Sequence, residues 1–583
     1  MSKVTETDVL IVGAGVAGLT AAALLARQGV SAITISKYPS TANTPRAHIT
    51  NQRTLEVMRD LGIESSLYQR GQLMAEVPHI VWTTTLAGHE LARKRSWGTG
   101  LHRKADYEAS SPSQMVNIGQ HLLEPIIHRR AVELGADIRF LNELVEISQD
   151  SSGVSASVRY LPTGDVHRIR ARYVIGADGG RSTVAQQIGF QLDGETGLGY
   201  ALNAWIEADL SSFVARRPGV LYWTVSPGRA YLFGSGTFLL VRQWNEWVLQ
   251  LSYDPATDDL DTSEEGVLAR VRLAIGDDSV PVKIKGMNKW EINHVVARDY
   301  RLGRVLLAGD AAHRHPPANG LGSNTSVQDS YNLAWKLAAV VRGQADPALL
   351  DTYSTERQPV GRQVIDRAVE SIGNATAILG AIGIAAGQNE QEGWEALEIL
   401  SSPTSEGESR RQELSRELQL FDYGVHCHGV EMGQRYRTGA VVDDGTPWPA
   451  DQADPQLFYQ PTTHPGAYLP HVWLEHDGSP ISTLDLTPAD SWALIVGVDG
   501  ESWRDAAKQV AEELGISIAT CAVGRGLEYS DVEGAWEKVR EITDRGCLLV
   551  RPDRHIAWRS IDAATDAAGS LGNVLRTILH PVT

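Results

Sequence analysis

The decisive stretch of the chain reads Asp8-Val9-Leu10-Ile11-Val12-Gly13-Ala14-Gly15-Val16-Ala17-Gly18, an apolar run followed by a GxGxxG pattern. The apolar run predicts a β-strand, and the periodicity from about Ala17 to Gln28 predicts a helix, with a second strand at Ala32–Ile35. Glycine at positions Gly13, Gly15 and Gly18 would let the backbone turn tightly and approach a pyrophosphate beside the helix N-terminus. The stretch therefore predicts a dinucleotide-binding β-α-β unit; a tight glycine turn without a ligand is the alternative.

The second strand lacks the acidic residue that usually ends it and binds the ribose hydroxyls. The chain reads Ile35-Ser36-Lys37 at this point. We expect Ser36 to hydrogen-bond the cofactor more weakly, with Lys37 beside it, unless another segment supplies this contact. The departure argues against a simple NAD site at the glycine turn.

Two further segments carry a carboxylate at the end of an apolar strand. One reads Tyr173-Val174-Ile175-Gly176-Ala177-Asp178-Gly179-Gly180-Arg181-Ser182. The other reads Val305-Leu306-Leu307-Ala308-Gly309-Asp310-Ala311-Ala312-His313 and continues through Pro316-Pro317 to Asn319-Gly320-Leu321-Gly322-Ser323-Asn324. Asp178 and Asp310 each stand just before a helix or turn, where a carboxylate can accept hydrogen bonds from hydroxyl groups. We therefore expect all three segments to bind one ligand.

Length and composition bound the class of protein. The 583 residues are too many for one ordinary domain, so two or three are expected. The net charge of −18 argues against a nucleic-acid partner, because phosphate contact needs a basic surface. Cys427, Cys521 and Cys547 form no CxxC, and His313 and His315 lack a third ligand nearby, so we expect no metal site. No stretch suits a signal peptide or a membrane span, which predicts a cytoplasmic protein without a membrane partner.

The rest of the pattern predicts a mixed sheet and a separate C-terminal unit. Short strand-like runs between about 80 and 300 are typical of a mixed sheet. A strand at Arg304–Ala308 precedes a helix from about Ser326 to Arg342. From about 365 to 420 the pattern is helical and increasingly charged, and it ends in the Ser/Glu/Arg-rich stretch 401–417, which is interpreted as a surface connection. Beyond about 435 a β-α-β-α-β-β order is expected, with elements at Trp492–Val498, Trp503–Leu514, Ile516–Val523, Asp531–Asp544, Cys547–Val550 and His555–Trp558.

Together with Thr44-Pro45-Arg46-Ala47-His48-Ile49-Thr50-Asn51-Gln52-Arg53, the three segments resemble the FAD fingerprint of flavoprotein aromatic hydroxylases, in particular the phenol and chlorophenol monooxygenases and 2-hydroxybiphenyl monooxygenase. The resemblance extends to the late segments His464–Trp473 and Leu549–Asp553. It implies an α/β (overall α+β) fold like that of p-hydroxybenzoate hydroxylase. A Rossmann-like FAD-binding domain would comprise 1–78, 102–184 and 295–420, with an inserted mixed-sheet substrate domain at 79–101 and 185–294. A thioredoxin-like domain without CxxC would occupy 435–583.

The resemblance also implies roles for individual residues. The glycines Gly13, Gly15 and Gly18 would hold the FAD diphosphate, and Gly322 and Asn324 would present N–H groups to the flavin pyrimidine edge. The other cofactor contacts implied by the matched motifs are Arg46, Gln120 and Asp310, with Pro317 in the third segment and Asp178 contacting both FAD and the nicotinamide cofactor.

Two residues are candidates for the catalytic face. In a phenol hydroxylase the substrate must lose its hydroxyl proton, and a histidine poised near neutrality suits that task, which points to His48. A histidine satisfied at a helix start is the alternative. Arg242 would steady phenolate or nicotinamide charge; a plain surface arginine is equally compatible with its sequence context.

The implied reaction is ortho-hydroxylation of a phenol with O2 through a flavin C4a-hydroperoxide. FAD would be bound tightly, and NADPH or NADH would bind transiently because the chain has no second nucleotide-binding β-α-β unit. The chain would form a homodimer or homotetramer. Hydroxylation of a polycyclic polyketide phenol and a non-catalytic flavin-binding sensor are the alternatives.

Overall fold

A computed structural model describes residues 4–228, 235–253, 255, 261–385, 387–488 and 490–580. The first of its two eight-stranded sheets has the order β17-β18-β11-β1-β2-β8. Off this path, β10 pairs with β11 and β9 pairs with β10. Its strands are β1 (Val4–Val12), β2 (Ala32–Ser36), β8 (Asp137–Phe140), β9 (Asn142–Gln149), β10 (Val154–Tyr160), β11 (Val166–Gly176), β17 (Arg301–Leu302) and β18 (Val305–Leu307).

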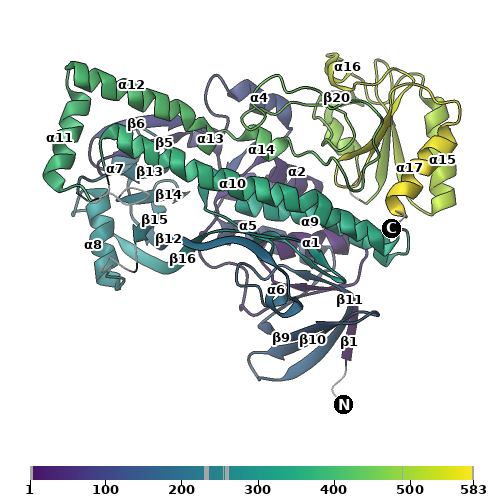
Figure 1. Ribbon diagram of the computed structural model, residues 1–583, viewed down its shortest axis with the longest axis horizontal. Helices are drawn as coiled ribbons and strands as arrows, with labels where there is room; N and C mark the ends of the chain where they lie inside the picture. The colour runs from purple at the N-terminus through teal and green to yellow at the C-terminus, as the bar shows by residue number, and fades with distance from the viewer. Residues whose placement is uncertain are drawn as a thin grey trace.

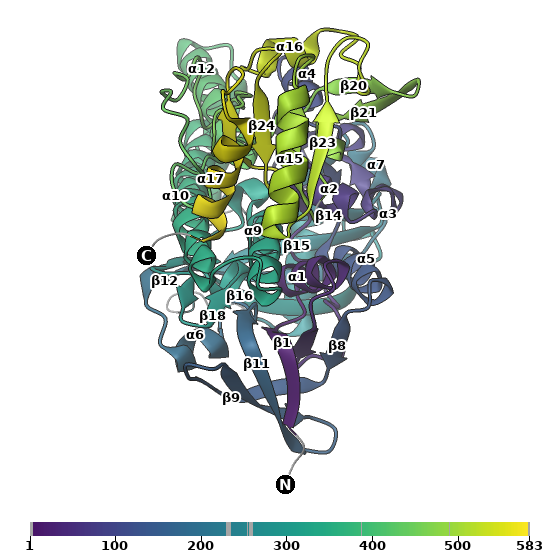
Figure 2. The same cartoon turned by 90° about the vertical axis from the view of Figure 1, so that its right-hand side faces the viewer.

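The parallel strands of this sheet end together. Val12 pairs with Ile35 of β2 and with Gly176 of β11, and Gly176 pairs with Leu307 of β18. The loops that follow these four strands therefore emerge at one edge, where open α/β sheets bind ligands. Helix α1 (Val16–Arg27) packs against α5 (Gln120–Glu133) and against α9 (Gly322–Val341) beside the sheet (Figure 2).

The second eight-stranded sheet is mixed and mostly antiparallel, with the order β19-β16-β12-β15-β14-β13-β5-β6. Its strands are β5 (His79–Thr83), β6 (Glu90–Arg95), β12 (Leu192–Glu207), β13 (Gly219–Thr224), β14 (Gly236–Arg242), β15 (Glu246–Tyr253), β16 (Lys283–Ala297) and β19 (His313–Arg314). A small sheet, β3 (Ile49–Thr50)–β7 (Val116–Asn117)–β4 (Gln72–Leu73), holds the segment that follows His48. The long helix α10 (Asp351–Ile382) lies across the molecule and packs on β16 (Figure 1).

The Ser/Glu/Arg-rich stretch 401–417 is largely helical and mostly exposed, as the helical pattern up to about residue 420 indicated. Helix α12 (Ser405–Leu420) follows α11 (Glu390–Ser401), and the two form the corner farthest from the C-terminal domain (Figure 1). The Thr404 side chain accepts a hydrogen bond from the Gly407 N–H and so caps the helix, while Leu414 is buried. Leu418 packs against the same core, and the helix contacts α10 and α11, so tertiary packing and the N-cap together order a helix that is otherwise polar.

The C-terminal unit contains a four-stranded sheet of order β23-β22-β24-β25. Its strands are β22 (Trp492–Val496), β23 (Ile518–Ala522), β24 (Cys547–Val550) and β25 (Ile556–Ser560). Helix α15 (Glu501–Leu514) packs beside α17 (Ala567–Leu579) (Figure 2). The sequence pattern did not predict α17. The helix expected at Asp531–Asp544 shortens to α16 (Ala535–Val539), because Gly534 and Glu541 have positive φ angles of 66° and 46°. Among the described residues, no helix combines the length and apolarity needed to cross a membrane.

A buried ion-pair cluster joins the C-terminal domain to α9 and α10. Arg551 donates hydrogen bonds to both carboxylate oxygens of Glu356, at 2.8 and 2.9 Å, and to Asp553. Lys336 donates to Glu356 at 2.7 Å, and all four charged side chains are at most 1 % exposed. Burial alone would raise the pKa of Glu356, but Arg551 and Lys336 lower it to about 2. The C-terminal domain is therefore held to helices α9 and α10 by buried ion pairs.

Candidate active site

The glycine turn between β1 and α1 allows close approach of the backbone. Gly13 has a φ of 111°, and a Cβ atom there would lie 2.1 Å from the Ala177 carbonyl oxygen. A Cβ atom on Gly18 would lie 1.9 Å from the Gly13 carbonyl oxygen, so both glycines are required by the protein itself. A Cβ atom on Gly15 would meet only a carboxylate oxygen of Glu124, at 3.7 Å. Gly15 therefore faces open space at the helix N-terminus, where a phosphate can approach.

Ser36 and Lys37 lie at the end of β2, at the same edge. Ser36 is buried, and its Oγ accepts a hydrogen bond from the Tyr38 N–H at 3.3 Å. Lys37 is exposed, and its ammonium lies 5.6 Å from the centre of the Tyr38 ring. The structure places both residues beside the glycine turn. Neither side chain offers the carboxylate with which an aspartate at this position would bind ribose hydroxyls.

The two strand-end carboxylates differ in how the protein engages them. Asp178 accepts hydrogen bonds from Ser182 Oγ at 2.5 Å and from the Val184 N–H at 3.1 Å. Asp310 is solvent-exposed and forms no hydrogen bond or ion pair with another described residue, and desolvation by neighbouring protein atoms raises the pKa of its carboxyl. A carboxylate with free acceptor capacity at the sheet edge can bind ligand hydroxyls.

The sequence did not point to Glu124 as a site residue. Glu124 is on α5, and its carboxylate lies beside Gly15 at the N-terminus of α1. It is 2 % exposed, and its carboxylate accepts hydrogen bonds from the Ala42 N–H and from Gln120 Nε2, both at 2.6 Å. Burial raises the pKa of Glu124, and the charge of Arg46 partly opposes this shift. Arg46 also acts on Asp310 and has no ion-pair partner among the described residues. The structure therefore brings Arg46, Gln120 and Asp310 together around the glycine turn.

His48 is held by a partner that the sequence did not reveal. Its Nδ1 lies 2.7 Å from Asn117 Oδ1. The Nδ2 of Asn117 donates to Gln72 Oε1 at 2.8 Å and to the Leu240 carbonyl oxygen at 3.1 Å, which fixes the orientation of the amide. Because the amide oxygen faces His48, we assign the ring proton to Nδ1, which leaves Nε2 as a proton acceptor.

Burial lowers the pKa of His48 to about 4, and the hydrogen bond with Asn117 offsets only part of this shift. The sequence led us to expect a histidine poised near neutrality, and the structure corrects this, because desolvation disfavours the charged imidazolium. His48 is therefore neutral at pH 7 and can accept a proton.

The N-terminus of α9 lies next to the His48 segment. Asn324 Oδ1 accepts a hydrogen bond from the Asn51 N–H at 3.0 Å, and Asn324 Nδ2 donates to the Ile49 carbonyl oxygen at 2.9 Å. Gly322 begins the helix, and the exposed Pro317 precedes the short turn Ala318–Gly320. The side chain of Asn324 thus fixes the strand that follows His48 to the helix expected to face the flavin.

Arg242 is part of a charged cluster. Its Nε lies 3.3 Å from Glu246 Oε2, while Lys285 Nζ lies 2.6 Å from Glu246 Oε1. Trp205 Nε1 also donates to Glu246 Oε1, at 2.9 Å, and Glu246 is buried. The Arg242 side chain remains 57 % exposed, so it keeps donor capacity for an anionic ligand.

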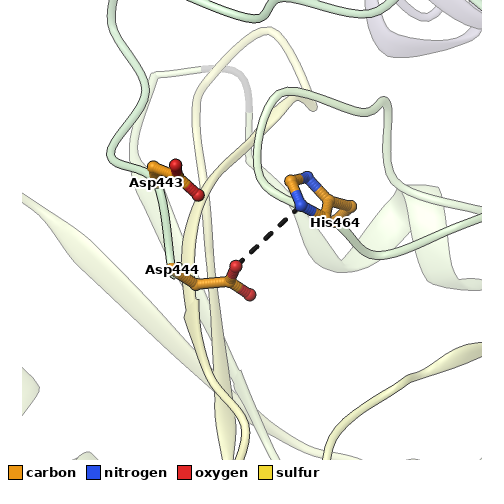
Figure 3. Close-up of side chains that lie close together, drawn as sticks. All are labelled: Asp443, Asp444 and His464. Carbon is orange, nitrogen blue, oxygen red and sulfur yellow. Dashed lines mark ion pairs between the residues drawn. The ribbon is translucent and has the colours of Figure 1, made fainter. Parts of the chain in front are cut away.

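Asp443, Asp444 and His464 form the one group of described residues with the spacing of metal ligands (Figure 3). Asp444 is already engaged, because Arg559 Nε lies 2.5 Å from its Oδ2. The two ring nitrogens of His464 each lie 3.0 Å from a backbone carbonyl oxygen. These contacts engage Asp444 and His464 within the protein itself, whereas Asp443 is exposed.

The arrangement at the sheet edge fits a flavin dinucleotide. The open Gly15, the unpaired Arg46 and the unengaged Asp310 offer space, charge and acceptors for a diphosphate and a polyol chain. Glu124, Asn117 and Glu246 orient the neighbouring polar side chains.

Comparison with known proteins agrees with this geometry. The model of the FAD-binding domain family matches residues 6–368, and that of the aromatic-ring hydroxylase C-terminal family matches residues 462–581. The chain is 43 % identical to 2,4-dichlorophenol 6-monooxygenase of Delftia acidovorans over 99 % of both chains.

Two solved structures share the whole architecture. The flavin-dependent monooxygenase PieE, in complex with FAD and substrate, superposes with a TM-score of 0.94 at 43 % identity, covering 98 % of this chain and 99 % of that one. Aklavinone-11 hydroxylase, in a ternary complex with FAD and aklavinone, superposes with a TM-score of 0.80 at 31 % identity, covering 99 % of both.

Proposed function

The chain belongs to the FAD-dependent aromatic-ring hydroxylases, and from this premise we propose that it hydroxylates a phenol ortho to its hydroxyl group. The balanced reaction consumes the phenol, O2, NAD(P)H and one proton, and yields a catechol, NAD(P)⁺ and water. One oxygen atom enters the ring and the other leaves as water. The relative at 43 % identity acts on a dichlorophenol, which supports a single-ring phenol as the substrate.

The arrangement of His48 and Asn117 beside the N-terminus of α9 carries this proposal. When bound, FAD supplies hydride acceptance and oxygen activation. The protein contributes a neutral imidazole whose Nε2 would accept the phenol hydroxyl proton, which makes the ring more electron-rich. Asn117 keeps the other ring nitrogen protonated and so maintains this tautomer. Arg242, held by Glu246, would steady the negative charge of the phenolate or of the nicotinamide cofactor.

We also propose the division of labour among the domains. FAD would bind to a discontinuous domain made of residues 1–78, 102–184 and 295–420. The residues that would contact FAD are Gly13, Gly15, Gly18, Ser36, Lys37, Arg46, Gln120, Asp178, Asp310, Pro317, Gly322 and Asn324. Residues 79–101 and 185–294 would bind the phenol, which is supported by the pairing of β5 and β6 with β12–β16 in one sheet. Residues 435–583 would form a thioredoxin-like domain, and the enzyme would act in the cytoplasm as a homodimer or homotetramer.

A panel of phenols tests the substrate class. The purified protein, loaded with FAD, is titrated with simple, chlorinated and aryl-substituted phenols and with polycyclic phenols, while the flavin spectrum and NAD(P)H oxidation are recorded. We expect spectral shifts and stimulated oxidation with single-ring phenols. Stimulation by polycyclic phenols alone would instead identify a polyketide hydroxylase, and spectral shifts without any NAD(P)H oxidation would identify a sensor.

Replacing Gly15 with alanine is expected to weaken FAD binding at least about tenfold without unfolding the protein, because the methyl group occupies the approach of the diphosphate and clashes with nothing else. FAD affinity is measured by fluorescence titration, and folding by circular dichroism. Gly13→Ala is the contrasting variant, since its methyl group would overlap the Ala177 carbonyl oxygen and should destabilise the fold itself. Equal FAD affinity in Gly15→Ala and wild type would place the diphosphate elsewhere.

Asp310→Ala is expected to release FAD during purification, because Asp310 has no hydrogen-bond or ion-pair partner among the described residues and its carboxylate is free to bind ribityl hydroxyls. The ratio of flavin to protein absorbance measures the loss. Asp351→Ala is a matched control, since Asp351 is exposed and pairs with Arg301 away from the sheet edge. A yellow and active Asp310→Ala enzyme would remove Asp310 from the cofactor site.

A further inference from the structure

A small cavity lies between helices α9 and α10 and the C-terminal domain. It has a volume of about 20 Å³. Its walls come from α2 (Gln52–Asp60), α9, α10, the segment 432–436, Tyr468 and the turn between β24 and β25. This volume accommodates one water molecule, which needs roughly 10–15 Å³, but no organic ligand.

Four lining residues present a polar atom without a hydrogen-bond partner among the described residues. These atoms are Arg357 Nη2, Asn332 Oδ1, Tyr468 Oη and His555 Nε2. The four residues are 1 %, 1 %, 4 % and 6 % exposed, respectively. An unpartnered buried polar atom costs roughly 1–3 kcal/mol, so four such atoms around one cavity indicate a shared ligand.

The chemistry of these four atoms defines that ligand. Arg357 Nη2 can only donate. Asn332 donates through Nδ2 to the carboxylates of Glu356 and Asp553, at 2.6 and 3.2 Å, so its Oδ1 can only accept. His555 Nδ1 lies 3.3 Å from the Asp553 carbonyl oxygen, and burial lowers the pKa of His555, so its neutral ring leaves Nε2 as an acceptor. The ligand must therefore accept a hydrogen bond from Arg357 and donate to Asn332 and His555, which leaves the Tyr468 hydroxyl to donate to it.

We propose that this cavity is a built site for one structural water molecule. Water has two protons to donate and lone pairs that accept, whereas a halide only accepts and an ammonium ion only donates. The charges agree with a neutral ligand, because Arg357 is already paired with Asp329, at 2.9 Å, and Asp553 with Arg551. An additional anion would have no compensating charge.

The water connects the C-terminal domain to the proposed flavin loop. Arg357 Nε donates to Asp329, which also accepts hydrogen bonds from His313 Nε2 at 2.8 Å and from the Gly309 N–H at 3.1 Å. Gly309 precedes Asp310. A continuous chain of hydrogen bonds thus runs from His555 through the water, Arg357 and Asp329 to this loop. The effect on FAD rests on the proposed function, whereas the water site does not.

The test uses crystals of the FAD-loaded enzyme soaked in sodium bromide. We expect density for one oxygen atom within hydrogen-bond distance of Arg357 Nη2, Asn332 Oδ1 and His555 Nε2, without anomalous bromide signal. A bromide peak there would identify a halide site, and the absence of density would identify a dry cavity; either result overturns the proposal.

A variant pair tests the connection to the flavin loop. His555→Phe removes one acceptor, and we expect the density to disappear and the FAD dissociation constant to rise about three- to tenfold. His555→Gln retains an acceptor and should restore much of the affinity, a rescue that a purely packing role would not give. Unchanged FAD affinity in His555→Phe, with the water lost, would overturn the connection. If wild type bound no FAD, the proposed function would fail while the water density would still decide the site.

Discussion

His48→Ala is expected to reduce the rate of phenol hydroxylation by about 10²- to 10⁴-fold while FAD stays bound, because general-base catalysis contributes a factor of this size. The variant removes the Nε2 that would accept the phenol proton, but it removes no side chain around the glycine turn. Product formation is measured together with the flavin content of the variant. His580→Ala, an exposed histidine near the C-terminus, should retain the wild-type rate.

The pH dependence sharpens this prediction. Burial lowers the pKa of His48 to about 4, so its neutral form persists as the pH falls from 7 toward 4. The acid limb assigned to His48 should therefore lie near pH 4 rather than near the ordinary histidine value of about 6.5. Loss of FAD in His48→Ala, or unchanged turnover with every phenol tested, would contradict the assigned role.

Arg551→Met is expected to lower the free energy of unfolding by roughly 3–5 kcal/mol, because it leaves Glu356 and Asp553 buried without their guanidinium partner. Urea denaturation of the FAD-loaded protein measures the change. Arg545→Met is the matched control, since the ion pair of Arg545 with Asp562 is about half exposed and should contribute only about 0–1 kcal/mol.

The same cluster predicts how stability depends on pH. Glu356 has a folded-state pKa of about 2, below the ordinary glutamate value of about 4.3 in the unfolded chain. Its contribution to stability is thus complete above about pH 4.3 and is lost as the pH falls through 2. In Arg551→Met this acid-side loss should shrink. Equal destabilisation by Arg551→Met and Arg545→Met would show that the buried ion pairs contribute no more to the free energy of unfolding than the exposed pair.

The parts of the site that could be predicted from the sequence are local in the chain. Gly13, Asp178 and Asp310 each stand at the end of a strand, and parallel strands bring such positions to one edge. The family resemblance then added Arg46 and His48. These residues could be found because each lies within a short motif whose backbone geometry determines its role.

The remaining features depend on contacts between distant segments. His48 and Asn117 are 69 positions apart and meet only because β3 pairs with β7. Arg551 and Glu356 are 195 positions apart, and no local pattern indicates that a charged pair will be buried. The lowered pKa of His48 likewise follows from tertiary burial rather than from its neighbours in sequence.

The fate of molecular oxygen tests the central claim most directly. The FAD-loaded enzyme is supplied with NAD(P)H, a single-ring phenol that stimulates NAD(P)H oxidation, and ¹⁸O2 in unlabelled water. The account predicts a catechol that carries one ¹⁸O atom ortho to the original hydroxyl group, formed in proportion to the NAD(P)H consumed. A catechol oxygen derived from water, or NAD(P)H oxidation that yields only hydrogen peroxide with every phenol, would contradict it.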